Sequence, residues 1–387
     1  MTSALGAGLQ PTLAALREQR SGLARQAWET VELDTCIGQV HGLDAVAFRA
    51  DLRAFDCRNN RLAQWALERD GLVTAVQAAI ARHGPRRVGV FLGTSTSGIL
   101  SSELAYRRRD PVSGGLPEDF DYRHTHNSYS LADFVRHYFG LTGPAVVVST
   151  ACSSGAKVFG TAQRMMACGL VDAAIVGGVD TLCLTTLYGF HSLQLISRQP
   201  CRPFDPQRDG ISIGEAAAFA LLESAEKPLP GDILLGGVGE SSDSHHMSSP
   251  HPEGLGARLA MQNALADAGL RPGDIDYIAL HGTATPSNDA AEDKGVSGLF
   301  GTDTPCSSIK GHTGHTLGAA GAVNAVVCAL ALAHDLAPAG VGTHSLDPAL
   351  RSRYLLNNLE RPLRHTLCNS FGFGGSNCSL VLSKVMA

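Results

Sequence analysis

The sequence predicts an α/β fold of two halves, in which mixed, mostly parallel sheets lie in layers with helices. Short β-rich segments alternate with longer segments of helical spacing on both sides of residue 230. The 387 residues include 43 glycines and only 6% aromatic residues, a composition typical of close helix–strand packing. Charges and prolines gather at 225–232, which marks the expected boundary between an N-terminal domain, 1–230, and a C-terminal domain, 231–387.

Each expected element is an apolar or β-branched run between turn residues. The first half should contain a helix at 11–19, strands at 86–95, 144–149 and 172–181, a helix after Cys152, and one or two strands at 210–224. The second half should contain strands at 233–239, 275–283 and 305–309, helices near 256–268 and 319–334, and two closing strands within 366–384.

Charge and cysteine usage exclude several classes of protein. The formal net charge of −5 gives no field that favours nucleic acid. The ten cysteines form no Cys-x-x-Cys pair, so we expect reduced thiols and no structural metal. His245, His246 and His251 lie in a Ser/Pro-rich loop without helical spacing, which disfavours a metal site there as well. We find no signal segment and no apolar run judged long enough to cross a bilayer, so we expect a cytoplasmic protein that does not bind membranes.

Cys152 is the most informative residue, because it lies where a predicted strand ends and a predicted helix begins. The free N–H groups and the dipole of a helix N-terminus favour negative charge, lower the pKa of a thiol and supply donors for an oxyanion. The arrangement is the cysteine counterpart of a nucleophile elbow. Taken alone, such a cysteine is more often a small buried hydrophobe.

Three further loops carry reactive residue types at the ends of second-half strands. They hold His281 in "IALHGTATPSND", Lys310 and His315 in "SSIKGHTGHTLGAAG", and two phenylalanines in the glycine-rich "NSFGFGGSN". Ligands of α/β sheets gather at the carboxyl ends of strands, so we expect these loops to meet at Cys152. A single histidine at a strand end would more often be a hydrogen-bonded structural residue.

Together these segments resemble the elongating β-ketoacyl-acyl-carrier-protein synthases, condensing enzymes with the thiolase fold. The resemblance covers nearly the whole chain and includes "STACSSGA", "CRPFDPQRDGISIGEAAA" and the three loops above. It implies an acyltransferase that joins a Cys152-bound acyl chain to malonyl-acyl-carrier protein by decarboxylative Claisen condensation, with no cofactor and no metal. Two segments, "GESSDSHHMSSPHPEG" and "GISIGEAAA", are similar to ketosynthases of aryl-polyene pigment clusters.

The resemblance also implies a role for each residue of the site. Cys152 would carry the acyl chain, His281 and His315 would flank the malonyl thioester, and Lys310 with Glu292 would order the site. The backbone N–H groups of Cys152 and Phe373 would form the oxyanion hole. Substrate contacts would come from Thr283, Thr285, Phe371, Phe373 and His246. Carrier-protein docking would use Arg53, Arg58 and Arg61. His312 would be a surface residue or a neighbour of the site.

Several alternatives stay open at this point. The partner would be acyl-carrier protein, and the assembly a homodimer or a heterodimer with a related subunit, paired through the strand at 145–149. A non-catalytic partner subunit of a second ketosynthase is one rival function, although such subunits lack the cysteine. A thiolase-like acyl-CoA transferase or hydrolase is the other. The family usually begins with a β-strand before a segment like "TSALGAGL", so we expect a core strand of the first half to be missing or replaced, and an upstream start codon would explain this.

Overall fold

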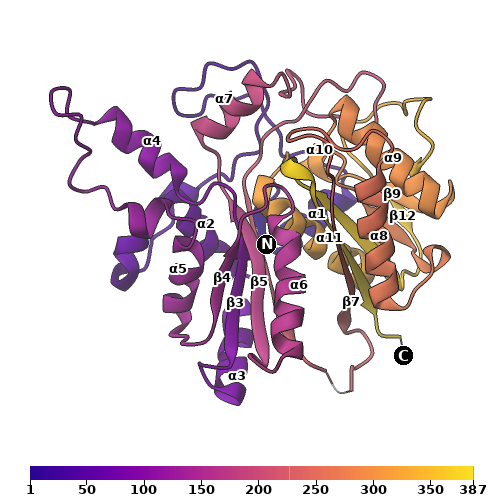
Figure 1. Ribbon diagram of the computed structural model, residues 1–387, viewed down its shortest axis with the longest axis horizontal. Helices are drawn as coiled ribbons and strands as arrows, with labels where there is room; N and C mark the ends of the chain where they lie inside the picture. Colours follow the sequence, from indigo (N-terminus) through magenta and orange to yellow (C-terminus); the bar gives the residue numbers. More distant parts are fainter. Residues whose placement is uncertain (226, 387) are drawn as a thin grey trace.

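Two six-stranded mixed sheets form the framework of the protein, as the sequence predicts (Figure 1). The computed structural model describes residues 1–225 and 227–386. The first sheet has the order β2 (Gly6–Ala7), β1 (Thr2–Ser3), β6 (Ala216–Glu223), β5 (Ala173–Asp180), β3 (Val88–Gly93) and β4 (Ala145–Val148). The second has the order β11 (Arg353–Tyr354), β9 (Pro305–Ser307), β8 (Tyr277–Ala279), β13 (His365–Phe371), β14 (Ser376–Lys384) and β7 (Ile233–Ser242). A small pair, β10 (Leu336–Ala337) and β12 (Leu359–Glu360), lies apart from both.

Helices cover both sheets and fill the space between them. In the first half they are α1 (Leu9–Arg17), α2 (Arg58–Leu67), α3 (Leu72–His83), α4 (Ile99–Arg107), α5 (Ser130–Phe139), α6 (Ser154–Ala167) and α7 (Leu184–Ser192). In the second half they are α8 (Leu255–Ala268), α9 (Pro286–Phe300), α10 (Lys310–Thr313) and α11 (Ala320–His334). Helices α2, α3 and α5 pack on the outer face of the first sheet, and α8 and α9 on the outer side of the second. Helices α6 and α11 form the central layer.

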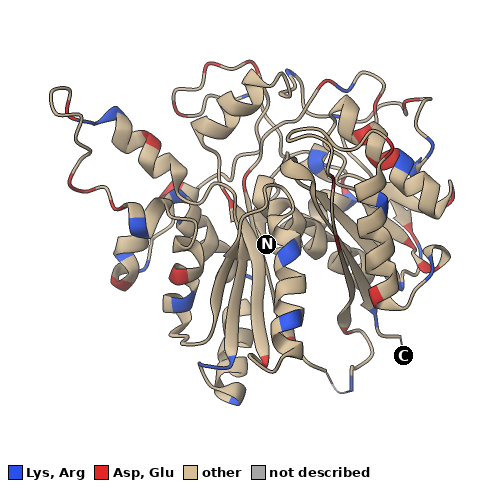
Figure 2. Ribbon diagram, in the orientation of Figure 1, with Lys and Arg blue, Asp and Glu red and all other residues tan. Residues whose placement is uncertain are grey.

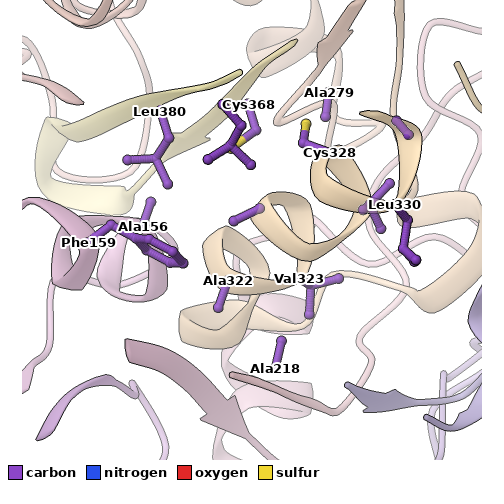
Figure 3. Packing of buried hydrophobic residues seen from close by; sticks show 14 of the residues in the cluster. Ala156, Phe159, Ala218, Ala279, Ala322, Val323, Cys328, Leu330, Cys368 and Leu380 are labelled. Carbon is purple, nitrogen blue, oxygen red and sulfur yellow. The ribbon is translucent and has the colours of Figure 1, made fainter. Parts of the chain in front are cut away.

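The central layer explains the small-residue composition. A Cβ on Gly321 of α11 would lie 2.4 Å from the Ala156 nitrogen of α6, so the two helices approach as closely as they do only with glycine there. Alanines and cysteines from both sheets surround the same helices (Figure 3). Of the two central helices, α11 has no Lys, Arg, Asp or Glu, whereas α6 carries Lys157 and Arg164 (Figure 2). A layer this tight fixes the strand ends on either side relative to one another.

Several details differ from the sequence-based expectations. The first helix begins at Leu9, two residues before Pro11, and the strand expected within 210–224 begins only at Ala216. Parallel pairs do not outnumber antiparallel ones, since each kind occurs five times within the two large sheets. Helices α2 to α5, α7, α9 and α10 were not expected from the sequence.

The structure bears on two regions that the sequence singled out: the boundary at 225–232 and the start of the chain. Strand β6 belongs to the first sheet and β7 to the second, and the stretch 225–232 between them includes residue 226, which lies outside the described residues. At the start of the chain, β1 pairs with only Ala216 and Ala217 of β6.

One helical stretch corrects the expectation about membrane-length segments. Leu317–His334 is long and apolar enough to cross a bilayer by length and composition, with a mean hydropathy of 1.8. Of this window, 78% is buried inside the fold, because most of it is the central helix α11. Such burial is what a core helix of a globular domain requires.

Candidate active site

Cys152 lies in a strained turn between β4 and α6. The preceding residue, Ala151, has φ of 51°, a left-handed conformation that non-glycine residues rarely adopt. Side chains hold the turn: Ser153 Oγ donates to the Thr150 carbonyl (2.8 Å), and Ser154 Oγ donates to the Ala151 carbonyl (2.6 Å). The turn therefore has the backbone geometry expected of a nucleophile elbow.

The electrostatics of this thiol differ from the sequence-based expectation. Burial raises the pKa of Cys152 to about 11, although the charge of Lys310 and the backbone N–H groups of Phe373 and Cys152 oppose the rise. The prediction of a lowered pKa was wrong, because the sequence analysis considered the helix dipole and omitted the desolvation of the thiolate. At neutral pH the resting residue is a neutral thiol.

Four strand ends bring the chemistry-bearing loops together. Cys152 follows β4, His281 follows β8, Lys310 and His315 follow β9, and Phe373 follows β13. The side-chain ligand atoms of Cys152, His281 and His315 all lie within 4.8 Å of one another, and all three residues are buried. The expected meeting of these loops is therefore present in the structure.

The two imidazoles face each other edge to face, with ring centroids 5.3 Å apart. Burial, reinforced by the charge of Lys310, lowers the pKa of both histidines well below the ordinary value, so both rings are neutral at pH 7. The backbone N–H of Leu317 donates to Nδ1 of His315 (3.1 Å). Because a neutral imidazole has one N–H, its proton is on Nε2, and His315 presents a donor from that atom.

Lys310 and Glu292 hold the backbone of His281 from opposite sides. Glu292 accepts from the N–H groups of His281 (2.8 Å) and Gly282 (2.6 Å), while Lys310 Nζ donates to the His281 carbonyl. Burial raises the pKa of Glu292 to about 7 and lowers that of Lys310. Within residues 1–225 and 227–386, no carboxylate lies within 4.0 Å of Lys310. The two groups thus meet through the peptide of His281 and form no direct ion pair.

A pocket lined by both apolar and polar side chains lies at this group. The apolar residues include Phe190, Leu195 and Ile211. The polar residues include Ser248, Ser249, Thr283, Thr285, Ser287 and Asn288. The expected substrate contacts Phe371 and Phe373 also line it, and the Phe373 ring lies 5.5 Å from that of Phe190. The lining thus offers both apolar and polar contacts to a ligand at Cys152.

Other expected site residues lie elsewhere. His246 is exposed, its Nδ1 bonds to Ser248, and it does not belong to the pocket lining. Arg58 is only partly accessible, with 8% of its side chain exposed, and its guanidinium bonds to the fully buried Glu215 (2.6 Å) and to Asp44 (2.7 Å). Arg61 pairs with Asp56, and Arg53 is exposed.

Two residues of the site escaped sequence reasoning. Asn369 Nδ2 donates to Glu292 (3.1 Å), and Phe190 lines the pocket. His312, expected at the surface or next to the site, is completely buried between the carbonyls of Arg20 (2.9 Å) and Ala339 (3.1 Å), so the surface alternative was wrong. Asn369 is the first residue of the glycine-rich motif "NSFGFGGSN", so the motif itself could have indicated it.

The Cys152, His281 and His315 group also fits a borderline-soft metal ion by donor type and spacing. Thiolate and imidazole are ligands that Zn²⁺ accepts, and the same atoms are a nucleophile with two neutral hydrogen-bond donors. A catalytic zinc site also needs hydrogen-bond partners for the outer nitrogens of its histidines. His281 Nδ1 is buried and has no such partner among the described residues. The missing partner favours the interpretation of the group as a nucleophile with two hydrogen-bond donors over that of a zinc site.

Comparison with known proteins agrees with this geometry. The β-ketoacyl synthase N-terminal domain matches residues 2–227, and the C-terminal domain of the same family matches residues 234–344. The chain is 38% identical over 318 residues to 3-oxoacyl-acyl-carrier-protein synthase 2 of Rhizobium meliloti, which covers 76% of this chain and 74% of that protein. It is 37% identical over 266 residues to a mitochondrial 3-oxoacyl-acyl-carrier-protein synthase of Arabidopsis thaliana, spanning 64% of this chain and 58% of that protein.

A solved structure extends the likeness to the whole chain. The ketosynthase ApeO of Xenorhabdus doucetiae, determined in complex with its chain length factor ApeC, superposes with a TM-score of 0.91 at 40% identity and covers 99% of this chain and 96% of that one. The resemblance inferred from the motifs and the thiolase-like fold are both confirmed. This chain belongs to the β-ketoacyl synthase family.

Proposed function

We propose that the chain is the catalytic ketosynthase of a decarboxylative Claisen condensation, which lengthens a Cys152-bound acyl chain by two carbons from malonyl-acyl-carrier protein. One observation carries the proposal: a thiol and two neutral imidazoles lie within 4.8 Å of one another at a pocket lined by apolar and polar side chains. Relatives named 3-oxoacyl-acyl-carrier-protein synthase support the substrate class.

The first step transfers the acyl group from the carrier thioester to Cys152. Sulfur attacks the acyl carbonyl, the carrier C–S bond breaks, and the proton lost by Cys152 ends on the carrier thiol. The N–H groups of Cys152 and Phe373 stabilise the tetrahedral oxyanion. Ionising a thiol of pKa about 11 at pH 7 costs about 5 kcal/mol. Burial favours the neutral thioester product for the same reason that it disfavours the thiolate.

The second step uses the two histidines. Loss of CO₂ from malonyl-carrier breaks a C–C bond, and the electron pair becomes an enolate whose oxygen accepts hydrogen bonds from His281 and His315. The enolate carbon then attacks the Cys152 thioester, its C–S bond breaks, and the departing thiolate takes up one proton. Neutral imidazoles suit this work, because each keeps one N–H group that can donate to the enolate oxygen.

Thr283 and Thr285 would contact the pantetheine arm, and Phe190 with the other apolar lining residues would contact the growing chain. Lys310 and Glu292 would position His281. We assign carrier docking to the exposed Arg53, with Arg61 nearby, and no longer to Arg58. The chain would act in the cytoplasm, with the two halves dividing near residue 230.

The pathway and the assembly complete the proposal. Strand β4 is an edge strand of the first sheet, so its free edge can pair with a second subunit. ApeO was solved with a chain length factor, which favours a heterodimer here, and its likeness together with the segments around His246 favours aryl-polyene synthesis. The rival role of a non-catalytic partner conflicts with an intact Cys, His and His group. An acyl-CoA transferase would need no decarboxylation.

Three variants test the proposed function with acyl- and malonyl-loaded carrier protein. Cys152→Gln should mimic the acylated state and promote malonyl decarboxylation without condensation. His281→Ala and His315→Ala should retain acylation of Cys152 and lose that decarboxylation. Condensed product from Cys152→Ala, or decarboxylation unaffected by both histidine variants, would overturn the assignment.

A further inference from the structure

Asp180, the last residue of β5, is a fully buried carboxylate in contact with the loop after β3 and with the turn that carries His315. Within residues 1–225 and 227–386, no Lys, Arg or His nitrogen lies within 4.0 Å of it. Hydrogen bonds stabilise its negative charge instead. Its oxygens accept from Thr94 Oγ1 (2.6 Å), Ser95 N (2.9 Å), Ser95 Oγ, Thr96 N (2.9 Å), Thr96 Oγ1 (2.8 Å) and Gly318 N (2.6 Å).

The bond to Gly318 is the one that reaches the active site. Gly318 fits tightly, because a Cβ there would lie 2.7 Å from Asp180 Oδ2 and 2.8 Å from Ser95 N. The residue before it, Leu317, has a left-handed φ of 52° and donates its N–H to Nδ1 of His315 (3.1 Å). A leucine keeps such a backbone only where its surroundings over-determine it. Asp180 supplies that constraint at the next peptide.

The position of this charge carries an electrostatic cost. The negative charge of Asp180 is one of the influences that raise the pKa of Cys152. A neutral residue at position 180 would spare the nucleophile this effect but would leave several buried donors with a weaker acceptor. The carboxylate of Asp180 therefore makes Cys152 harder to ionise, but it also fixes the turn beside His315.

We propose that Asp180 is a positioning residue for the condensation. By accepting the Gly318 N–H it fixes the 317–318 turn and keeps Nδ1 of His315 as an acceptor. The proton on Nε2 then stays directed at the malonyl thioester oxygen. The proposal rests on the proposed function for its kinetic consequence, but the imidazole tautomer can be observed without any substrate.

Asp180→Asn tests the link with little change of shape. The amide retains one oxygen and presents an NH₂ group in place of the other, which repels the donor groups of the turn. We expect ¹⁵N NMR of histidine-labelled protein, with the His315 signal assigned by its loss in His315→Ala, to change from one tautomer to a mixture. We expect malonyl decarboxylation in the Cys152→Gln background to fall at least tenfold, and acylation of Cys152 in the otherwise native chain to change less than threefold.

A second variant and a control guard against an effect on folding alone. Gly318→Ala displaces the same turn and leaves Asp180 intact. It should therefore lower malonyl decarboxylation and spare acylation, as Asp180→Asn does. It also serves as the test if Asp180→Asn does not fold. Asp205→Asn replaces another buried carboxylate that accepts backbone N–H groups, away from the pocket, and should alter neither the tautomer nor the ratio of the two rates.

An unchanged His315 tautomer in folded Asp180→Asn and in Gly318→Ala would overturn the positioning role, and so would equal losses of decarboxylation and acylation. Failure of the proposed function is recognised separately, because the wild-type protein itself would then neither acylate Cys152 nor decarboxylate malonyl-carrier, whatever the tautomer of His315.

Discussion

Two buried cations of this protein have opposite surroundings. Arg58, on the first turn of α2, bonds twice to Glu215 (3.0 and 2.6 Å) and once to Asp44 (2.7 Å). Lys310 is more deeply buried, with 2% of its surface exposed, yet its Nζ donates to the carbonyl of His281 and has no carboxylate within 4.0 Å in the described chain. Burial lowers the pKa of Lys310, whereas the bonds and the charge of Glu215 more than offset burial at Arg58 and raise its pKa.

The comparison indicates that the charge of Arg58 stabilises the fold, whereas the charge of Lys310 acts on the reactive groups. Glu215 also accepts from the backbone N–H groups of Val40 (2.9 Å) and Leu182 (3.1 Å), so the Arg58 pair ties four segments together. The field of Lys310 has no close counter-charge and acts on Cys152, His281 and His315. A buried cation without a partner carboxylate, next to a nucleophile, is a functional feature.

Breaking the Arg58 pair should give the largest effect. Glu215→Leu leaves Arg58 with Asp44 alone and removes the acceptor of the Val40 and Leu182 N–H groups, so it should lower the free energy of unfolding by about 3–5 kcal/mol. Denaturant unfolding measures the loss, and condensation per folded molecule should stay within a fewfold of wild type. A fully stable Glu215→Leu protein with weakened carrier binding would show that Arg58 is a docking residue after all.

Neutralising Lys310 should change activity much more than stability. Lys310→Met removes a buried charge and the bond to the His281 carbonyl, so condensation should fall about a hundredfold, an effect in the range of losing one preorganised electrostatic contact. The free energy of unfolding should fall by no more than about 1 kcal/mol, because the desolvation cost of the ammonium is also removed. Parallel kinetics and unfolding curves measure both. A stability loss as large as that of Glu215→Leu would erase the distinction between the two cations.

The pH dependence of thiol alkylation sharpens the same point. With a Cys152 pKa of about 11, thiolate is scarce at pH 7 and rises about tenfold per pH unit, so alkylation by iodoacetamide should accelerate through pH 10. Lys310→Met removes a cation that stabilises the thiolate, which raises the pKa further and should slow alkylation about tenfold at a given pH. Peptide mapping in a Cys168→Ser background excludes the exposed cysteine. A plateau below pH 8 would contradict the raised pKa.

The smallest effect concerns docking. Arg53→Glu reverses an exposed charge and should raise KM for carrier-bound substrate about threefold, with little change for small acyl thioesters. Steady-state kinetics with both substrates measure the difference. Equal changes for the two substrates would remove Arg53 from the docking surface.

The sequence predicted the local features of the site better than their environment. Cys152, His281 and His315 were found because each stands at a strand end within a specific motif, and strand ends converge in such folds. The Arg58 pair could not be found, since Glu215 lies 157 positions away and only tertiary packing joins them. The raised pKa of Cys152 was missed for a related reason: desolvation depends on everything packed around the thiol, whereas a helix dipole is visible from local sequence.

The most direct test of the account is acylation of the purified chain followed by elongation. Incubation with acyl-carrier protein and then malonyl-carrier protein, followed by intact-mass analysis and peptide mapping, should show an acyl thioester on Cys152 that disappears as a β-ketoacyl-carrier product two carbons longer accumulates. An acyl group on another residue, or elongated product without any adduct at Cys152, would contradict it.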